Sequence, residues 1–506
     1  MSAPTGWKRL FTAVTLITAA VAHAAPPPLL WGADSQGGAP YVFQDPMDPT
    51  RLVGFEVELA GLLGQKLGRQ ARPIHGQWDK LLDLLARGDF ELAINGIEIA
   101  EEKKRVVALS RPYFATAEVL TIRKGDASAP RTLAQLKGRK VGTLSGTMAD
   151  RILRDAEAEV RTYEGGQNEI YDDLKLGRID AVLFDEPAAL YYGEIEDSLE
   201  TFRGDFGEVL YAIALRKEDA ELLGQVNAAL EQLEKDGSLR ALYEKWGVWS
   251  PETAKLFSTE AKPRTDAVEY DRWKAAVGKL PSFWVRLTTR YPAMLGTFFV
   301  GALLTLAVSL CAMTLAIGLG ISLALGRRFG PKPLQWFAIA YIEFFRGTPL
   351  LIQLIVIYFG LPELGLKLDP FFAGVLALGL NYAAAEAENY RAGLESVPRG
   401  QVEASEVLGL STWQTLRFVV GPQALRISIP PMTNDFIALL KDSSLVSIVT
   451  LTELTKTYGN LANSTRDHLG LGLVVAVFYL LLGLPFARLA RAAERHFGKH
   501  LRREAT

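Results

Sequence analysis

The most constraining feature of this 506-residue chain is a change in character near its middle. From Pro26 to about Pro292 charged residues are dense, and no apolar run approaches the roughly 20 residues that a helix needs to cross a bilayer. From Met294 onward such runs dominate. The overall composition of 49% apolar and 22% charged residues, with a net charge of -2, hides this division. The sequence therefore predicts a soluble first half and a membrane-embedded second half.

The N-terminus has the pattern of a secretory signal. Lys8 and Arg9 precede an apolar run at residues 10–22, and the small-x-small triplet AHA ends at Ala24. We expect a signal peptide over 1–24, with a retained membrane anchor as the alternative, and hence export of the soluble half. Cys311, inside an apolar run, is the only cysteine of the sequence, so no disulfide can form within one chain.

The exported half alternates strand and helix patterns, which is typical of a largely parallel sheet covered by helices on both faces. The predicted strands are 29–33, 91–94, 119–123, 140–144, 181–184 and 211–215, and the predicted amphipathic helices include 56–67, 79–86, 149–156 and 222–234.

Five segments of this half, in this order, carry a family resemblance: VGFEVELAGLLGQKLG, WDKLLDLLARGDFELAING, LKGRKVGTLSGT, GRIDAVLFDEPAALYY and LRALYEKWG. The half resembles the polar amino acid (family 3) type of periplasmic solute-binding proteins. The resemblance implies an α/β two-lobed periplasmic binding protein of type II over 25–250, with ligand in the cleft between the lobes. Lobe 1 would comprise about 26–118 and 206–249, and lobe 2 about 119–205.

An amino acid ligand needs a cation site and an anion site. Asp185 follows the apolar strand AVLF and matches the family acid that takes the ammonium group. Gly146 and Thr147 open a helix after a strand, so their backbone donors and the helix N-terminus are candidates for the carboxylate. Trp78 matches a position that stacks on ligand, with a core aromatic as the alternative. Gly96 lets the backbone approach a ligand closely.

Three positions depart from the family. Lys103 stands where the carboxylate-clamping arginine is expected and offers a point charge instead of a bidentate fork, with Arg105 as the alternative. Glu98 replaces a small hydroxyl residue, and either selects a cationic side chain or pairs with Lys103. The aromatic shelf falls on Gly38, which makes Tyr41 the candidate replacement.

Residues 251–292 lose the alternating pattern. They read as a polar linker that ends in an interfacial segment with Trp273, Phe283 and Trp284, because amphipathic aromatics suit a membrane surface. The alternative is a further helix of the soluble domain.

The second half predicts an all-α transmembrane domain of five helices over 293–495, with a tail at 496–506. An odd number of spans after an exported domain places the C-terminus in the cytoplasm, and most flanking basic residues then lie inside. Within the spans, Glu343 with Arg346 and Glu388 with Arg391 are spaced to pair, whereas Glu386 has no family counterpart. The predicted spans are about 294–325, 334–360, 371–392, 423–454 and 469–490.

Between the third and fourth spans the chain reads EASEVLG, ending at Gly409, and then VVGPQALR. Gly409 fits the left-handed position that ends one helix, and Ser411 with Gln414 forms a capping box that starts another. With YIEFFRGTPLLIQLIVIYFGLP and NDFIALLKDSSLVSIV, this half resembles the histidine and glutamine type of ABC importer permease. The resemblance makes 398–422 the coupling loop that docks on an ATPase subunit, through Glu403, Ala404, Gly409 and Pro422.

The sequence contains no GxxxxGK[ST] phosphate loop, so ATP and Mg are expected on a separate ATPase subunit. We expect a transporter subunit that is not itself an enzyme and holds no metal, no cofactor and no nucleic acid. It would import a polar amino acid across the inner membrane, as a homodimer or paired with a related permease. The alternatives are a ligand-gated channel, for which no TVGYG-like filter appears, and a membrane sensor, for which no cytoplasmic output domain is evident.

Overall fold

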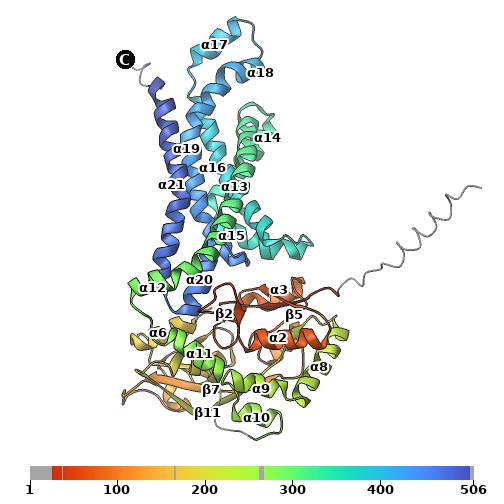
Figure 1. Cartoon of the computed structure of the whole chain (residues 1–506). Coiled ribbons are helices and arrows are strands. Elements are labelled where there is room, and N and C mark those ends of the chain that lie inside the picture. Colours follow the sequence, from red (N-terminus) through yellow and green to blue (C-terminus); the bar gives the residue numbers. More distant parts are fainter. Residues whose placement is uncertain (1–25, 37, 164–166, 261–266, 502–506) are drawn as a thin grey trace, which may run out of the picture.

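The computed structural model describes residues 26–36, 38–163, 167–260 and 267–501. The predicted signal peptide at 1–24 lies outside the described residues, as do residues 502–506 of the predicted tail. Figure 1 shows an α/β domain at one end and a helical domain that extends away from it.

Lobe 1 of the α/β domain is built on a five-stranded sheet in the order β4-β1-β5-β12-β6. β1 is parallel to β4 and β5, while β12 is antiparallel to β5 and β6. The strands are β1 (Leu29–Ala33), β4 (Ala71–His75), β5 (Leu92–Ala93), β6 (Ala108–Leu109) and β12 (Ala214–Leu215), and the main helices are α2 (Phe55–Lys66), α3 (Leu81–Arg87), α8 (Ala220–Lys235) and α9 (Ser238–Lys245).

Lobe 2 has its own five-stranded sheet, in the order β11-β7-β10-β8-β9. Its elements are β7 (Phe114–Arg123), β8 (Lys140–Leu144), β9 (Glu159–Tyr163), β10 (Ala181–Asp185), β11 (Leu199–Tyr211), α5 (Met148–Asp155) and α6 (Gln167–Lys175). β7 and β11 pair with each other and carry the chain between the lobes. The two-lobed fold is thus confirmed, but the prediction of one largely parallel sheet was wrong, because each lobe has a mixed sheet closed by strands that return from the other lobe.

The predicted linker is largely helical. It contains α10 (Pro251–Leu256), α11 (Val268–Val277) and α12 (Phe283–Thr289). Trp273 is buried against lobe 2, with its ring 4.7 Å from that of Tyr191 and 5.9 Å from that of Tyr192. The prediction of an interfacial Trp273 was therefore wrong, since the neighbouring tyrosines supply an apolar surface for it, whereas Trp284 is 72% exposed.

The helical domain packs α16 against α13 and α19, and α19 against α21. Its elements are α13 (Tyr291–Phe329), α14 (Lys332–Gly347), α15 (Leu350–Ile355), α16 (Pro370–Glu395), α17 (Arg399–Val407), α18 (Thr412–Thr415), α19 (Gly421–Asp442), α20 (Leu454–Thr465) and α21 (His468–Leu501). The long helices run side by side away from the α/β domain, and α12 and α20 lie next to it (Figure 1).

Two predicted spans are not continuous helices. Among the described residues, α13 and α21 alone are single helices long and apolar enough to cross a membrane, and α14 with the segment from Leu350 forms a third candidate bent by 104°. The predicted span 334–360 is bent because Pro349 lacks a backbone N–H and cannot continue the hydrogen bonding of α14. The predicted span 423–454 is likewise interrupted, since α19 ends at Asp442 and Thr450 adopts a left-handed φ of 67°.

Paired charges account for some of the acids in the helical domain. Glu388 pairs with Arg391 at 2.7 Å and with Arg327 of α13. No ion pair joins Glu343 to Arg346 in the part of the chain that the structure describes, so that pairing was wrong. Glu386 is fully buried, and neither of its carboxylate oxygens has a hydrogen-bond partner.

Candidate functional site

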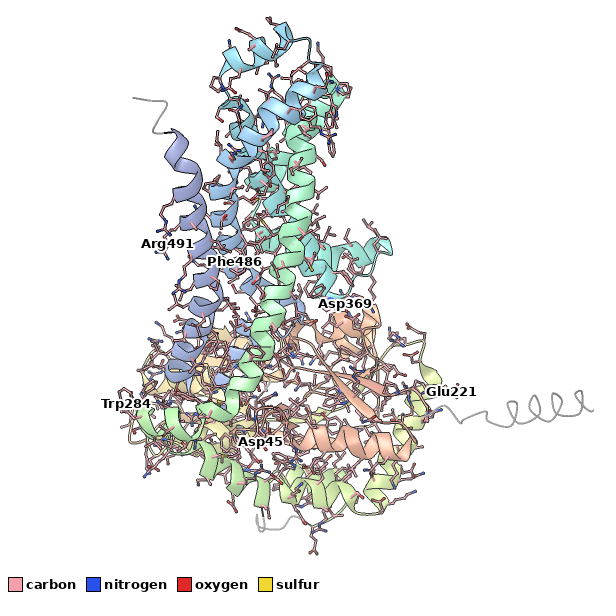
Figure 2. All side chains as sticks on the ribbon, turned by 45° about the horizontal axis from the view of Figure 1, so that its top comes forward. Asp45, Glu221, Trp284, Asp369, Phe486 and Arg491 are labelled. Atoms are coloured by element: carbon pink, nitrogen blue, oxygen red, sulfur yellow. The ribbon has the colours of Figure 1, made fainter. Side chains whose placement is uncertain are left out.

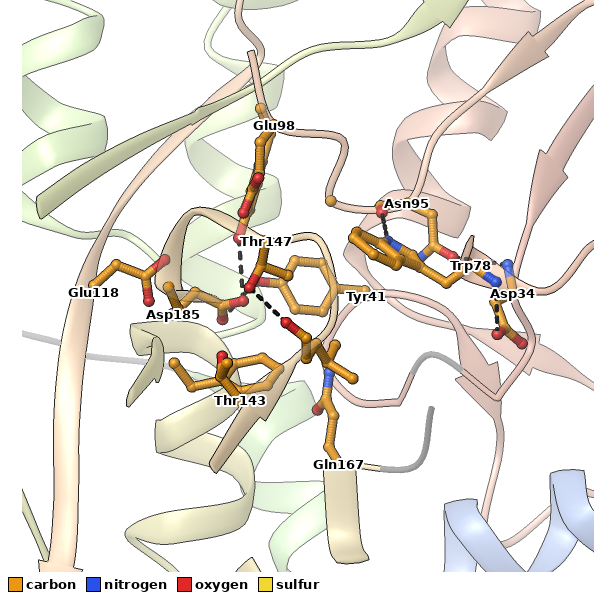
Figure 3. Close-up of a pocket in the computed structure, with 15 residues that line it drawn as sticks. Asp34, Tyr41, Trp78, Asn95, Glu98, Glu118, Thr143, Thr147, Gln167 and Asp185 are labelled. Atoms are coloured by element: carbon orange, nitrogen blue, oxygen red, sulfur yellow. Dashed lines mark hydrogen bonds between the residues drawn. The ribbon is translucent and has the colours of Figure 1, made fainter. Parts of the chain in front are cut away.

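The main cavity of the α/β domain lies between the two lobes (Figure 3). Six of the predicted substrate-binding residues line it: Tyr41, Trp78, Gly96, Glu98, Thr147 and Asp185. Lys103 and Gly146 are not among the lining residues. The structure thus brings together side chains from β10, from the start of α5 and from the loops that follow the strands of lobe 1.

Asp185 ends β10 and caps the short helix α7 (Glu186–Ala188). Its carboxylate accepts hydrogen bonds from the Ala188 backbone N–H at 2.9 Å, the Tyr41 hydroxyl at 2.7 Å and the Tyr211 hydroxyl at 3.1 Å. Burial raises the pKa of Asp185 to about 6, although these three donors act to lower it. The acid is therefore fixed in place. Tyr211 was not predicted from the sequence.

Trp78 lies along the lobe 1 wall. Its ring N–H donates to the Asn95 carbonyl at 3.0 Å, and its backbone N–H donates to Asp34 Oδ2 at 3.1 Å. Gly96 has a left-handed φ of 57°, and its N–H donates to the buried Glu56 carboxylate at 2.7 Å. These bonds hold the loop after β5 against the cavity.

Glu98 joins the two lobes. Its Oε1 accepts the backbone N–H of Met148, the first residue of α5, at 2.8 Å. Its Oε2 lies 3.4 Å from Lys103 Nζ and 3.7 Å from an Arg151 guanidinium nitrogen. The structure shows Glu98 paired with Lys103, and its role in selecting a cationic side chain stays a prediction. Glu98 thereby contacts Lys103 and the N-terminus of α5, both of which were predicted to receive a ligand carboxylate.

Gly146 is also engaged within the protein. Its backbone N–H donates to Asp150 Oδ2 at 3.2 Å, and Thr147 caps α5 by accepting the N–H of Asp150. The Gly146 donor thus serves the helix cap.

Two further residues that line the cavity each have a buried side-chain oxygen without a hydrogen-bond partner. Glu118 lies on β7 directly opposite Asp185 of β10, is 2% exposed, and its Oε2 accepts no hydrogen bond. Burial and the charges of Asp185 and Glu98 raise its pKa well above the usual range. The Thr143 hydroxyl is likewise buried and unpaired. The signal for Glu118 was present in the sequence, as a lone acid within the apolar strand FATAEVLTIR.

Lobe 1 contacts the helical domain at two places. Arg87 donates to the Tyr358 carbonyl at 2.6 Å and stacks over its ring at 3.9 Å. Asp89 pairs with Lys367 at 2.5 Å, close to Asp369, the cap of α16, which lies beside the α/β domain in Figure 2.

At the second place, Lys456 of α20 is buried and lies 3.2 Å from Gln36 Oε1. Gln36 in turn donates its backbone N–H to Asp34, a residue that lines the cavity. A single intervening residue therefore separates the cavity wall from the helical domain.

Lobe 2 contacts the same domain independently. Asn168 donates to the Asn463 carbonyl at 2.8 Å, and Glu196 pairs with Arg466 at the end of α20. Both lobes thus contact the same helical domain.

The predicted coupling loop forms a helical hairpin of α17 and α18 at the end of the helical domain far from the α/β domain (Figure 1). Gly409 has a φ of 78°, and Ser411 with Gln414 makes both bonds of a capping box, so both predictions are confirmed. Ser405 and Thr415 join the two helices through hydroxyls 2.9 Å apart. Glu403 and Ala404 lie on α17, and Pro422 lies in the first turn of α19.

Large apolar side chains of this hairpin face solvent. Val407 is 87% exposed, Leu408 79% and Trp413 64%. Exposed apolar side chains gathered in this way mark a surface that contacts another protein or a membrane.

Comparison with known proteins gives a match in each half. Residues 31–248 match the family of bacterial extracellular solute-binding proteins, family 3, and residues 316–499 match the binding-protein-dependent transport system inner membrane component. The second half is 40% identical over 183 residues to the probable glutamine ABC transporter permease protein GlnM of Bacillus subtilis (strain 168), covering 36% of this chain and 85% of that protein.

The first half is 37% identical over 210 residues to the L-cystine-binding protein TcyJ of Escherichia coli (strain K12), covering 41% of this chain and 78% of that protein. Among solved structures, an ancestral arginine-binding protein bound to glutamine is 32% identical, covers 44% of this chain and is itself covered to 98%, with a TM-score of 0.41.

Proposed function

Because the chain belongs to the amino acid ABC importers, as a family 3 solute-binding domain fused to a permease domain, we propose that one polypeptide performs both capture and passage. The binding domain takes a polar amino acid on the outer side of the cytoplasmic membrane. The permease domain then passes it inward, driven by ATP that a partner subunit hydrolyses.

The observation that carries this proposal is the contact of both lobes with one end of the permease domain. Arg87 and Asp89 of lobe 1 and Asn168 and Glu196 of lobe 2 all contact permease residues. Ligand closes the lobes, and the closed pair presents both sets of contacts at once. Fusion also keeps the receptor at an effective concentration of about the millimolar range for a short linker.

The exposed apolar side chains of the α17–α18 hairpin support the proposal that an ATPase subunit binds there. Val407, Leu408 and Trp413 supply a surface that a groove of that subunit would bury. ATP and Mg would bind there, outside this chain. The permease half would pair with a second copy or with a related permease, most simply about a twofold axis.

The positive-inside rule supports a cytoplasmic hairpin and a periplasmic binding domain. Arg327, Arg391, Arg399 and Arg491 follow or flank the helix ends that lead away from the binding domain. Arg286 and Arg290 lie near the other end, where Arg286 is neutralised by Asp467 at 2.5 Å.

Transport in proteoliposomes that contain the chain and its ATPase tests the proposal. We expect uptake of a labelled ligand only when ATP is present on the hairpin side, together with ligand-stimulated ATP hydrolysis. Uptake that needs no nucleotide would instead favour the ligand-gated channel, and ligand binding without any uptake would favour the sensor.

A further inference from the structure

The acids that line the cleft differ in what the protein itself supplies to them. Asp34 accepts the backbone N–H of Gln36 on one carboxylate oxygen at 2.8 Å and that of Trp78 on the other at 3.1 Å. The charge of the buried Lys456 also favours the ionised form of Asp34. The protein therefore satisfies this acid without a ligand.

Glu98 is satisfied in a similar way. Its carboxylate accepts the Met148 N–H at 2.8 Å and lies 3.4 Å from Lys103 Nζ and 3.7 Å from an Arg151 guanidinium nitrogen. Two cations thus lie beside one carboxylate, so Glu98 requires no positive charge from a ligand.

Glu118 and Asp185 are the other two acids of the cavity wall. The hydrogen bonds that Asp185 accepts come from two tyrosine hydroxyls and a backbone N–H, all of which are neutral. Glu118 is 2% exposed, and its Oε2 accepts no hydrogen bond. A buried carboxylate oxygen without a donor is costly, so we expect the ligand to supply the donor that Glu118 lacks.

The two acids are neighbours. Glu118 of β7 lies directly opposite Asp185 of β10, and Figure 3 shows both side chains on the same side of the cavity. An amino acid brings one α-ammonium group, which neutralises one of the two carboxylates. The other carboxylate then needs a second positive charge, which only the side chain of the ligand can supply.

The same cavity contains a donor for the ligand carboxylate. The Thr143 hydroxyl lines the cavity, is buried and has no hydrogen-bond partner. A hydroxyl can donate to a carboxylate, so this oxygen suits the one negative group of an amino acid. A second carboxylate, on an acidic side chain, would instead face Glu118 and Asp185. The unsatisfied groups of the cleft thus match two positive charges and one negative charge.

We propose that the substrate is a basic amino acid, with its α-ammonium group at Asp185 and the cationic end of its side chain at Glu118. Glu118 is then the residue that selects basic over neutral side chains. This inference rests on the proposed function and deepens it, because it names the class of amino acid that the importer carries.

Two pairs of matched ligands test the proposal on the full chain in detergent, with binding measured by calorimetry. Citrulline is arginine with a neutral urea group in place of the guanidinium, and norleucine is lysine without its side-chain amine. We expect arginine, lysine or both to bind at least about 10-fold more tightly than the neutral counterpart, the scale of a hydrogen bond to a charged group.

Glu118→Gln keeps the shape of the side chain and removes its charge. In the pair with the larger preference, it should lower the ratio of cationic to neutral ligand affinity by at least about 10-fold. Asp185→Asn is the matched control, because both ligands of a pair carry the α-ammonium group. It should weaken both and leave their ratio unchanged. A thermal scan of each variant shows whether it is folded.

Three results would overturn the inference. Neutral ligands that bind as tightly as their cationic counterparts to the unmodified chain would show that Glu118 is protonated and donates to a neutral side chain, and would leave the proposed amino acid importer standing. A ratio that a folded Glu118→Gln variant leaves unchanged, or that Asp185→Asn lowers instead, would remove the role assigned to Glu118. Binding of none of the twenty common amino acids would reject the proposed function as well.

Discussion

At the scale of single residues, Asp185 is the acid that the structure fixes most firmly in the cleft, through three hydrogen-bond donors. We expect Asp185→Asn to weaken ligand by about 1.5–3 kcal/mol, the usual range for a hydrogen bond to a charged group. The fold should survive, because asparagine caps a helix as well as aspartate does. Calorimetry on the full chain measures the affinity, and a thermal scan of the same sample serves as the control. An unchanged dissociation constant in a well-folded variant would remove Asp185 from the site.

The buried carboxyl group of Glu56 is expected to make the stability of the fold depend on pH. Burial raises its pKa from 4.5 to about 7, although the Tyr113 hydroxyl and the Gly96 N–H act to lower it. A raised pKa in the folded state means that the fold favours the protonated acid, so this stability is present below pH 4.5 and is lost as the pH rises through about 7. The contribution is at most about 3 kcal/mol.

We therefore expect the melting temperature of the binding domain within the full chain to fall between pH 5 and 8. Glu56→Gln resembles the neutral acid and should flatten that slope, leaving the shares of Asp185, whose pKa is about 6, and of Glu118, whose pKa burial also raises. A slope that is the same in both proteins would assign the pH dependence to other groups.

The residues of the cleft differ in how well their roles could be predicted from the sequence. Asp185 was predictable because it follows a strand within a long family motif. Glu118 was harder to predict, because only its place as a lone acid within an apolar strand points to it. The contact of Glu98 with Met148 was not predictable, because it joins residues 50 positions apart across two lobes and depends on how the lobes close.

At the scale of elements, the α17–α18 hairpin depends on a backbone conformation. Gly409 is left-handed, and no atom lies within 4 Å of the position that a Cβ would take, so a side chain there costs backbone strain of roughly 1 kcal/mol without a clash. We expect Gly409→Val to redirect α18 and to lower ligand-stimulated ATP hydrolysis and uptake together, with ligand affinity unchanged. The measurement is uptake by proteoliposomes that contain the ATPase.

Gly400→Ala is the matched control for this hairpin. Gly400 lies within α17, also has no atom within 4 Å of its Cβ position, and has no left-handed φ, so alanine should be tolerated. Wild-type uptake in the Gly409 variant would show that the hairpin does not couple transport to ATP.

Elements with a clear local signal were predicted well. β1 and β8 match the predicted strands residue for residue, and the capping box fixed the start of α18. β11 was missed except for its last residue because its sequence, LETFRGDFGEVLY, is rich in charge and lacks alternation, and its pairing with β7 stabilises it instead. The bend between α14 and α15 follows from Pro349, which an average over an apolar window conceals.

At the scale of the whole molecule, docking of the binding domain on the permease domain should be linked to ligand binding. Both favour closed lobes. Arg466 pairs with Glu196 across the domain boundary. We expect Arg466→Ala to lower uptake and to weaken ligand by up to about 5-fold, the effect of losing about 1 kcal/mol of coupling. Lys175→Ala is the control, since Lys175 contacts the same Glu196 from within lobe 2. Equal effects of the two variants, or none from Arg466→Ala, would contradict the linkage.

The contact between Asp89 and Lys367 has a mechanical consequence. Lys367 lies three residues before α16, and α17 begins four residues after α16 ends, so one helix joins the receptor contact to the hairpin. Its 26 residues make a rod of about 39 Å. A continuous helix is stiff along its axis, and α16 packs against α13 and α19. We therefore expect a displacement of the hairpin along the axis of α16 to move Lys367 and, through their ion pair, Asp89 at the edge of the binding domain.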